Sequence, residues 1–341
     1  MKKRVLYFDV LKIIAIMFVI LIHVISEYWE NLDVNSNTFI VLSVLESISR
    51  FCVPAYFMVS GALFLNEEKK VTIKDVLKKY VLKIFLLFVF WNITYSVINS
   101  VINHDAITFK LIGNILLDTL LGNGVFHLYF LPIIIGFYLC LPILKQITKE
   151  ENRNILKYFI IILFIFFSFN RITNYLFGIS LSYTIVFTKY LIYFILGYYL
   201  NTFTISKKNT NIIYILGVFG LIITILGTII SSKVNGITDV FFKNDTFNVI
   251  LYSSAIFLFA KNNFIRFNEG LLKVLTQTNF GVYLIHGLVL GFLEYMKLFN
   301  ILDSTSILLS VIVDSVIIYV LSSFSVYILM KIPYIKKLVS I

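Results

Sequence analysis

The sequence predicts an all-α membrane protein, a bundle of about ten transmembrane helices that forms one domain over residues 1–341. Of the 341 residues, 59% are hydrophobic and only 14% are charged, with a mean hydropathy of +0.92. Soluble domains carry about 25% charged residues, so this balance indicates a lipid environment. Long apolar runs recur along the chain, and a helix needs about 20 apolar residues to cross a bilayer. These runs lack the alternation of transmembrane β-strands, so helices are predicted.

Ten apolar runs follow one another, separated by short polar connections. The fifth and eighth are short for a full crossing and could be extensions of neighbouring segments, which would change the number of crossings by one pair. The ten predicted spans are 7–26, 39–65, 80–101, 126–144, 156–169, 183–200, 212–230, 247–260, 280–295 and 307–330.

Basic residues concentrate in alternate connections. Twenty of the 29 Lys and Arg residues fall in one set of loops and five in the opposite set. Positively charged loops stay in the cytoplasm, so both chain ends are predicted to be cytoplasmic. The net charge of +11 is then explained by anchoring to an anionic inner leaflet, and nucleic acid is not expected as a partner. The twenty residues are Lys2, Lys3, Arg4, Lys69, Lys70, Lys74, Lys78, Lys79, Lys145, Lys149, Arg153, Lys157, Lys207, Lys208, Lys261, Arg266, Lys273, Lys331, Lys336 and Lys337.

The first predicted span carries a polar stripe. Asp9, Lys12 and His23 are related by three- and four-residue helical steps and therefore share one face. Lys12 and His23 are 11 residues apart, which is about 16 Å along a helix axis. Ionisable residues inside a membrane are costly and often functional. The alternative is an interfacial ion pair between Asp9 and Lys12, with His23 as a hydrogen-bonded packing residue.

Other polar residues are predicted at the depth of His23, in the outer half of the membrane. Glu46 and Arg50 in the second span are four residues apart and can form an ion pair on one helix face. Asp314 in the last span has a similar depth, and His127 opens the fourth span. A histidine oriented by a carboxylate is typical of a general base or an acyl-accepting nucleophile. Pairing of Glu46 with Arg50 alone is the competing structural interpretation.

Five sequence blocks, in order along the chain, resemble the acyltransferase-3 family of membrane O-acyltransferases. Each block alone is a weak apolar pattern, but their order on a ten-helix topology is specific. The blocks are FDVLKIIA at 8–15 leading to His23, VPAYFMVSG at 53–61, HLYFLP at 127–132, LGYY at 196–199 and FGVYLIH at 280–286.

The resemblance implies an enzyme that moves an acyl group, commonly acetyl from cytoplasmic acetyl-CoA, onto a hydroxyl of a cell-surface glycan or lipid-linked sugar outside. The family's histidine in the first helix corresponds to His23, which we expect to be catalytic with Glu46. Lys12, Lys78, Lys79 and Lys83 stand where the family usually has arginines. Lysine keeps the charge but lacks the bidentate fork that suits phosphate. These lysines are the expected coenzyme A site, although inner-leaflet anchoring would also explain them.

Further polar residues complete the predicted site. His127, Arg50 and Asp314 are expected to bind the acceptor. His286 is predicted about 10 Å from the cytoplasmic end of its span, beside the donor entrance and apart from the outer cluster. A packed histidine is equally consistent with its sequence context. Asn92, Asp118 and Lys189 are membrane-embedded residues without a predicted partner, and no metal-ligand spacing is present, so no metal is expected.

Two other classes of protein remain open from the residues alone. A transporter or flippase of glycan or lipid-linked sugar would also need polar groups in the bundle, but such proteins show paired half-repeats, which are not found here. A membrane-bound sensor or binding module has no specific support. Lysine outnumbers arginine by 24 to 5, a bias typical of low-GC bacteria, so a bacterial plasma membrane is the expected location.

Overall fold

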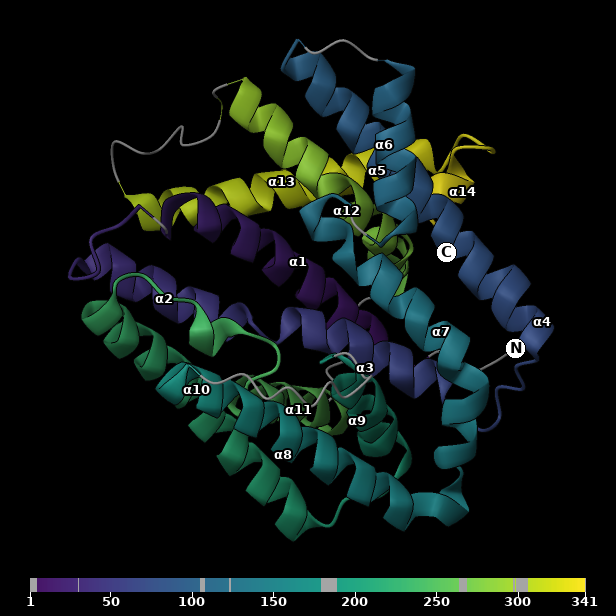
Figure 1. The fold of residues 1–341 in the computed structure, drawn as a ribbon, viewed down its shortest axis with the longest axis vertical. Helices are drawn as coiled ribbons and strands as arrows, with labels where there is room; N and C mark the ends of the chain where they lie inside the picture. Colours follow the sequence, from purple (N-terminus) through teal and green to yellow (C-terminus); the bar gives the residue numbers. More distant parts are fainter. Residues whose placement is uncertain are drawn as a thin grey trace.

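The computed structural model describes residues 5–29, 31–104, 108–122, 124–178, 189–263, 269–296, 298 and 306–340. Within these ranges every regular element is a helix (Figure 1). Seven helical segments of the described chain are long and apolar enough to cross a membrane. The prediction of an all-helical, polytopic membrane protein is therefore confirmed. The seven segments are Leu6–Trp29, Asn37–Phe64, Ile73–Ile102, Phe126–Ile147, Glu150–Phe177, Lys207–Asn235 and Ile307–Leu329.

The crossing segments consist of single helices or of short helical pieces joined end to end. A π-helical turn over Val76–Val81 joins α4 to α5, and 3-10 turns occupy Phe126–Tyr129, Glu150–Asn152 and Val240–Phe242. The α-helices are α1 (Leu6–Trp29), α2 (Asn37–Ser49), α3 (Cys52–Phe64), α4 (Ile73–Asp75), α5 (Leu82–Ile102), α6 (Phe109–Leu120), α7 (Phe130–Ile147), α8 (Arg153–Phe177), α9 (Leu191–Thr202), α10 (Lys207–Asn235), α11 (Phe247–Asn262), α12 (Glu269–Tyr295), α13 (Ile307–Leu329) and α14 (Lys336–Val339).

Several helices are longer than the apolar runs that predicted them, α8 and α12 among them. The predicted short fifth span is a helix of 25 residues, α8, which ends at Gly178 with a φ of 66° that glycine adopts without strain. The predicted ninth span starts eleven residues earlier than expected, because the polar sequence from Glu269 onward is already helical in α12. The helix of the predicted sixth span, α9, has 12 residues, and the preceding residues 179–188 lie outside the described chain.

The predicted second span is one crossing with a break in its middle. α2 and α3 are separated by Arg50 and Phe51. Pro54 has no N–H to donate to the carbonyl of Arg50, four residues earlier, so one helical hydrogen bond is missing at the break. The Tyr252 hydroxyl donates to the nearby carbonyl of Ile48 at 3.0 Å. The end of α2 at the break therefore has a hydrogen-bond partner on α11.

Helix α1 is the centre of the bundle and packs against α2, α3, α12 and α13. Close contact between α3 and α9 depends on one glycine from each helix. A Cβ atom at Gly61 would lie 1.7 Å from the Phe194 carbonyl oxygen, and one at Gly197 would lie 2.0 Å from that of Met58. Small residues let helix backbones approach in membranes, where lipid provides no hydrophobic drive for helices to associate. The two glycines thus explain why the LGYY and VPAYFMVSG blocks pack together.

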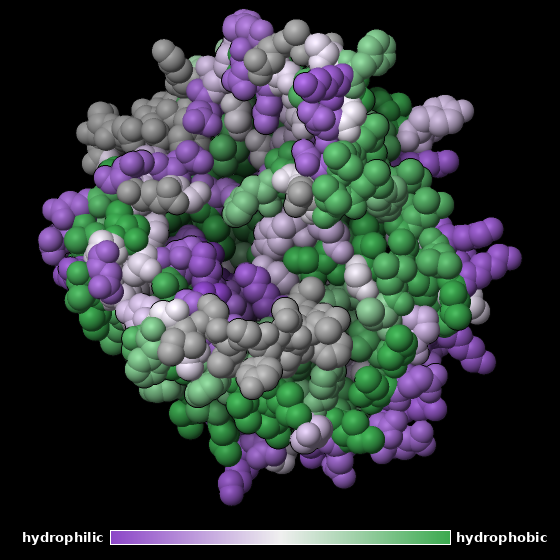
Figure 2. Space-filling model, viewed as in Figure 1, coloured by the Kyte–Doolittle hydropathy of each residue, from purple (hydrophilic) through white to green (hydrophobic). Residues whose placement is uncertain are grey.

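The first turn of α1, the short helix α4 and helix α14 lie on the same side of the bundle (Figure 1). α14 packs against α12 and α13, and the Trp91 indole N–H donates to the Leu338 carbonyl at 2.9 Å. Much of the surface between the ends is apolar, including exposed side chains such as Val218 and Ile230 on α10 (Figure 2). Such a surface suits lipid contact.

Candidate functional site

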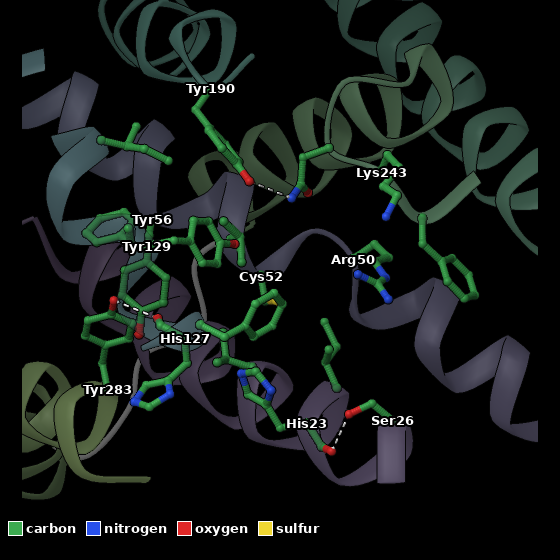
Figure 3. Close-up of a pocket in the computed structure, with 18 of the residues that line it drawn as sticks. His23, Ser26, Arg50, Cys52, Tyr56, His127, Tyr129, Tyr190, Lys243 and Tyr283 are labelled. Atoms are coloured by element: carbon green, nitrogen blue, oxygen red, sulfur yellow. Dashed lines mark hydrogen bonds between the residues drawn. The ribbon is translucent and has the colours of Figure 1, made fainter. Parts of the chain in front are cut away.

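A cavity of about 620 Å³ lies between α1, the α2–α3 break, the start of α7, α12 and the 3-10 turn Val240–Phe242. Figure 2 shows a hollow on this face of the molecule with hydrophilic side chains around it. His23, His127 and Tyr283 lie on one side of the cavity, and Arg50 and Lys243 lie on the other (Figure 3). The wall is therefore part aromatic and part charged.

Three of the four histidines in the sequence meet beside this cavity. The ring centroids of His23 and His286 are 5.3 Å apart, those of His127 and His286 are 5.2 Å apart, and those of His23 and His127 are 6.4 Å apart. They come from α1, from the turn before α7, and from α12. Imidazole exchanges protons near neutral pH, so the cluster has the chemistry of a general base. We call these three residues the histidine cluster.

His286 belongs to this cluster, so the prediction that it lies apart from the outer group is wrong. His23 follows the first residue of α1 by 17 positions, and His286 follows the first residue of α12 by 17 positions. Both rings are therefore about 25 Å along their helices at 1.5 Å per residue. The apolar run starts at Phe280, whereas the helix begins at Glu269, because the more polar residues before the run are already helical.

The hydrogen bonds of His286 define its tautomer. Its Nδ1 lies 2.8 Å from the Tyr283 carbonyl oxygen and 3.2 Å from that of Val282. A carbonyl oxygen only accepts, so Nδ1 carries the hydrogen and Nε2 has the lone pair. His286 is 1% exposed, and its Nε2 has no hydrogen-bond partner among the described residues. An acceptor without a partner in a buried site is costly and indicates a missing donor.

His127 is held in place by its surroundings. The Tyr95 ring packs against it edge to face with centroids 4.6 Å apart, and the Tyr283 hydroxyl donates to its backbone carbonyl at 2.9 Å. A Cβ atom at Gly287 would lie 2.7 Å from the Cε1 atom of His127, so only glycine leaves room for the ring. Asn92, which had no predicted partner, accepts a hydrogen bond from the Val125 N–H at 3.0 Å and so holds the segment that leads to His127.

Glu46 and Arg50 form the ion pair that their spacing predicted, within the same cavity. Glu46 is 3% exposed, and the Arg50 guanidinium lies 4.5 Å from the centroid of the Phe242 ring. The Glu46 carboxylate thus hydrogen-bonds to Arg50, while the nearest rings to His23 are those of the other histidines and Phe126. The pair shapes the charged side of the cavity.

The predicted donor lysines lie away from the cavity. Lys78 and Lys79 are in the π-helical turn, Lys83 is in the first turn of α5, and none of the three is among the lining residues of the described chain. Lys79 pairs with Asp75 at 2.6 Å on its own helical segment. A π-helical turn often marks a functional site, because it changes the direction of side chains along a helix. The structure therefore places these lysines together at the end of the bundle near α4 (Figure 1).

Lys12 lies between the two regions. Its ammonium is 3.1 Å from Asp9, as the ion-pair interpretation predicted. Its backbone carbonyl accepts from the Asn279 amide at 2.9 Å and lies 3.0 Å from the Tyr56 hydroxyl. The Tyr56 hydroxyl is also 2.8 Å from the Asn279 side-chain oxygen. Tyr56 lines the cavity, so this polar bridge separates the cavity from the end of α1 that carries Lys12.

Of the remaining polar residues named from the sequence, one predicted to bind the acceptor does not line the cavity, and one without a predicted role does. Asp314 is buried in α13 at 5% exposure and is not among the described residues that line the cavity. Lys189 does line it, although no partner had been predicted. Cys52 also lines the cavity, although a single thiol in an apolar span resembles a packing residue. No sequence pattern singled out the tyrosines or the segment after α10. These residues line the cavity: Tyr129, Tyr190, Asp239, Lys243 and Asn244.

Comparison with known proteins agrees with the resemblance in the sequence blocks. The model of the acyltransferase-3 family, an acyltransferase domain, matches residues 5–331. No curated protein and no solved structure matches the chain. The match covers all three members of the histidine cluster and nearly the whole chain. The protein is a multi-pass membrane enzyme, an acyltransferase that belongs to the acyltransferase-3 family.

Proposed function

We propose that the protein transfers an acetyl group from cytoplasmic acetyl-CoA to a hydroxyl of a glycan or lipid-linked sugar on the outer side of a bacterial plasma membrane. The observation that carries this proposal is the histidine cluster beside a cavity of about 620 Å³. Sites of this size are typical of small-ligand binding. Aromatic and hydrogen-bonding side chains in one wall suit a sugar, which has both apolar faces and hydroxyls.

In the proposed reaction His23 is the general base. Its ring lines the cavity and takes the proton of the acceptor hydroxyl, while the hydroxyl oxygen attacks the thioester carbonyl carbon. The carbon–sulfur bond breaks, and the proton on His23 passes to the departing sulfur of coenzyme A. The products are an ester and the free thiol, so atoms and charge balance without a metal. Transfer through an acetylated His23 is the covalent variant of the same route.

The donor enters from the side of the lysines. Coenzyme A is polyanionic, and Lys78, Lys79, Lys83 and Lys12 supply positive charge at that end of the bundle. The acetyl arm then has to pass the bridge between Tyr56 and the Lys12 carbonyl to reach His23, about 16 Å further along α1. The bridge must therefore open during turnover.

The acceptor enters from the other side. We assign Arg50 and His127 to acceptor binding because both line the cavity, together with Lys189 and Lys243. The sequence predicts that Asp314 also contacts the acceptor. Its burial in α13 supports a role in packing between helices instead. Both chain ends are cytoplasmic in this proposal and the chain crosses the membrane ten times, which is supported by the twenty-to-five distribution of basic residues.

The direct test is incubation of the purified, reconstituted protein with acetyl-CoA labelled in the acetyl group. The acceptor probe is a preparation of envelope glycans and lipid-linked sugars from the cell in which the protein naturally occurs. We expect loss of thioester and label in the glycan fraction, both absent with His23→Ala. Movement of lipid-linked sugar across the vesicle membrane without thioester loss would contradict the proposal and favour a flippase.

A further inference from the structure

We propose that His286 is a positioning residue that fixes the tautomer and orientation of His23. This inference rests on the proposed role of His23 as the base. In hydrolases with a serine, histidine and aspartate, a carboxylate holds one ring nitrogen of the catalytic histidine so that the other is free to take a proton. Here the neutral ring of His286 would do this through the lone pair of Nε2, and Glu46 remains with Arg50.

The first support is the chemistry of His286 itself. Nδ1 donates to the Tyr283 and Val282 carbonyls, so Nε2 is left as an acceptor within the membrane region. That nitrogen is buried and has no donor among the described residues. With ring centroids 5.3 Å apart, a His23 nitrogen turned toward His286 Nε2 would lie about 3 Å from it, because ring atoms lie about 1.1 Å from each centroid. A rotation of the His23 ring would therefore complete the bond.

The second support is that His23 is the ring of the cluster that is free to turn toward His286. His127 is also near His286, and its Nε2 is buried without a partner among the described residues, but its ring is fixed by Tyr95 and by the space at Gly287. His23 has no side-chain hydrogen bond among the described residues, and its ring is partly open to the cavity. A base with a free ring would spend much of its time in an unproductive orientation or tautomer. A hydrogen bond to His286 would hold the His23 ring in the productive orientation and tautomer.

The consequence for the reaction follows from the direction of the bond. Before transfer, one ring nitrogen of His23 donates its hydrogen to His286 Nε2, and the other nitrogen faces the acceptor hydroxyl. After proton transfer His23 is an imidazolium with two N–H groups, of which one remains bonded to His286. The bond to a charged donor is stronger than the bond to a neutral one. His286 thus stabilises the charge that develops on His23, without itself gaining or losing a proton.

Two substitutions of His286 separate this role from a structural one. In His286→Asn the side-chain N–H₂ can still donate to the carbonyl of Tyr283, as Nδ1 does, but nothing accepts at the position of Nε2. In His286→Gln the amide reaches the position of Nε2, and its oxygen can accept from His23. If His286 only anchors α12, Asn is the better substitute. If it positions His23, Gln is the better substitute.

The experiment measures kcat and KM for labelled acetyl-CoA with each variant, using the envelope preparation described above as acceptor. We expect kcat for His286→Asn to fall on the order of 100-fold, His286→Gln to keep a several-fold higher kcat than Asn, and KM for acetyl-CoA to stay within twofold. Equal or higher kcat for Asn would overturn the inference. An increased KM with unchanged kcat would overturn it too and would return His286 to the donor path. If the unaltered protein transfers no acetyl group, the proposed function itself has failed.

Discussion

The histidine cluster and the lysines near α4 are both polar regions of a largely apolar protein, but they are built differently. The cluster takes residues from α1, α12 and the turn before α7, and the Nε2 atoms of His127 and His286 have no hydrogen-bond partner among the described residues. The lysines come from one helical segment, and Lys79 has its partner four residues away. Buried groups from distant segments must be held by the fold, whereas exposed charges on one helix need no such support. The first region is therefore suited to chemistry and the second to attraction of an anion.

The largest effect is expected at His23. Replacement of His23 by Ala or by Gln should lower acetyl transfer by a factor of 10² to 10⁴, because an amide can hydrogen-bond but cannot take a proton. The measurement is transfer per folded molecule, with monodispersity in detergent as the folding control. Near-normal turnover of His23→Gln would show that the histidine cluster does not supply the base. The cluster would then no longer differ from the lysine region by its chemistry.

Gly287→Ala tests whether the cluster depends on its geometry. The new Cβ would lie 2.7 Å from His127 Cε1 and 3.0 Å from the Tyr95 hydroxyl, so the His127 ring must move. We expect kcat/KM to fall about tenfold or more, since small misplacements in an active site are costly. Gly291→Ala on the same helix is the matched control, because its new Cβ would meet no atom of the described chain within 4 Å apart from its immediate neighbours and its own helix backbone. Equal activity of both variants would mean that the position of His127 is not critical.

A smaller effect is expected at the lysines. The triple change of Lys78, Lys79 and Lys83 to Gln should raise KM for acetyl-CoA roughly tenfold, with kcat little changed, because exposed charge pairs contribute about 0.2–1 kcal/mol each. The difference from the unaltered protein should shrink at high salt. Lys207 and Lys208 at the start of α10 provide the control pair. An unchanged KM would indicate that the three lysines only anchor the protein to the inner leaflet.

The sidedness of the membrane topology, which assigns the donor and acceptor sides, can be tested with single cysteine substitutions that should leave activity intact. In a background with Cys140→Ser, a cysteine at Asn35 should react with an impermeant thiol reagent added to intact cells, and one at Ser340 should react only after the cells are opened. Cys52 is fully buried and should not interfere. Labelling of position 340 from outside would reverse the assignment of the donor and acceptor sides.

Sequence reasoning was most successful where a pattern lies within one helix. The face shared by Asp9, Lys12 and His23, and the pair of Glu46 with Arg50, follow from helical periodicity, and both ion pairs are present. It failed for His286 because an apolar run marks where lipid begins and not where a helix begins. Eleven residues of α12 precede the apolar run, and they place His286 about three turns further from the start of the helix than the apolar run predicts.

The rest of the site could not be predicted because it depends on contacts between helices. The meeting of three histidines requires the relative height of α1, α7 and α12, which no spacing within one segment contains. The break at Arg50 could have been suspected from Pro54, since proline removes one helical hydrogen bond. The choice between Glu46 and His286 as the neighbour of His23 is likewise set by packing, because both residues are at compatible depths.

The bridge of Tyr56, Asn279 and the Lys12 carbonyl has a consequence for the cell's energy supply. A cavity that reaches far into the bilayer, opposite a basic entrance, would form a water-filled leak if the two were joined. Such a leak would dissipate the proton gradient that drives ATP synthesis. The Asn279 amide donates to the Lys12 carbonyl, and the single hydrogen of the Tyr56 hydroxyl is shared between the Lys12 and Asn279 oxygens, so the bridge closes this route. Tyr56→Ala should increase proton flux through vesicles that contain the protein. An enzyme that moves a small group between two compartments, as proposed for this protein, must block the ions whose gradient is kept between them.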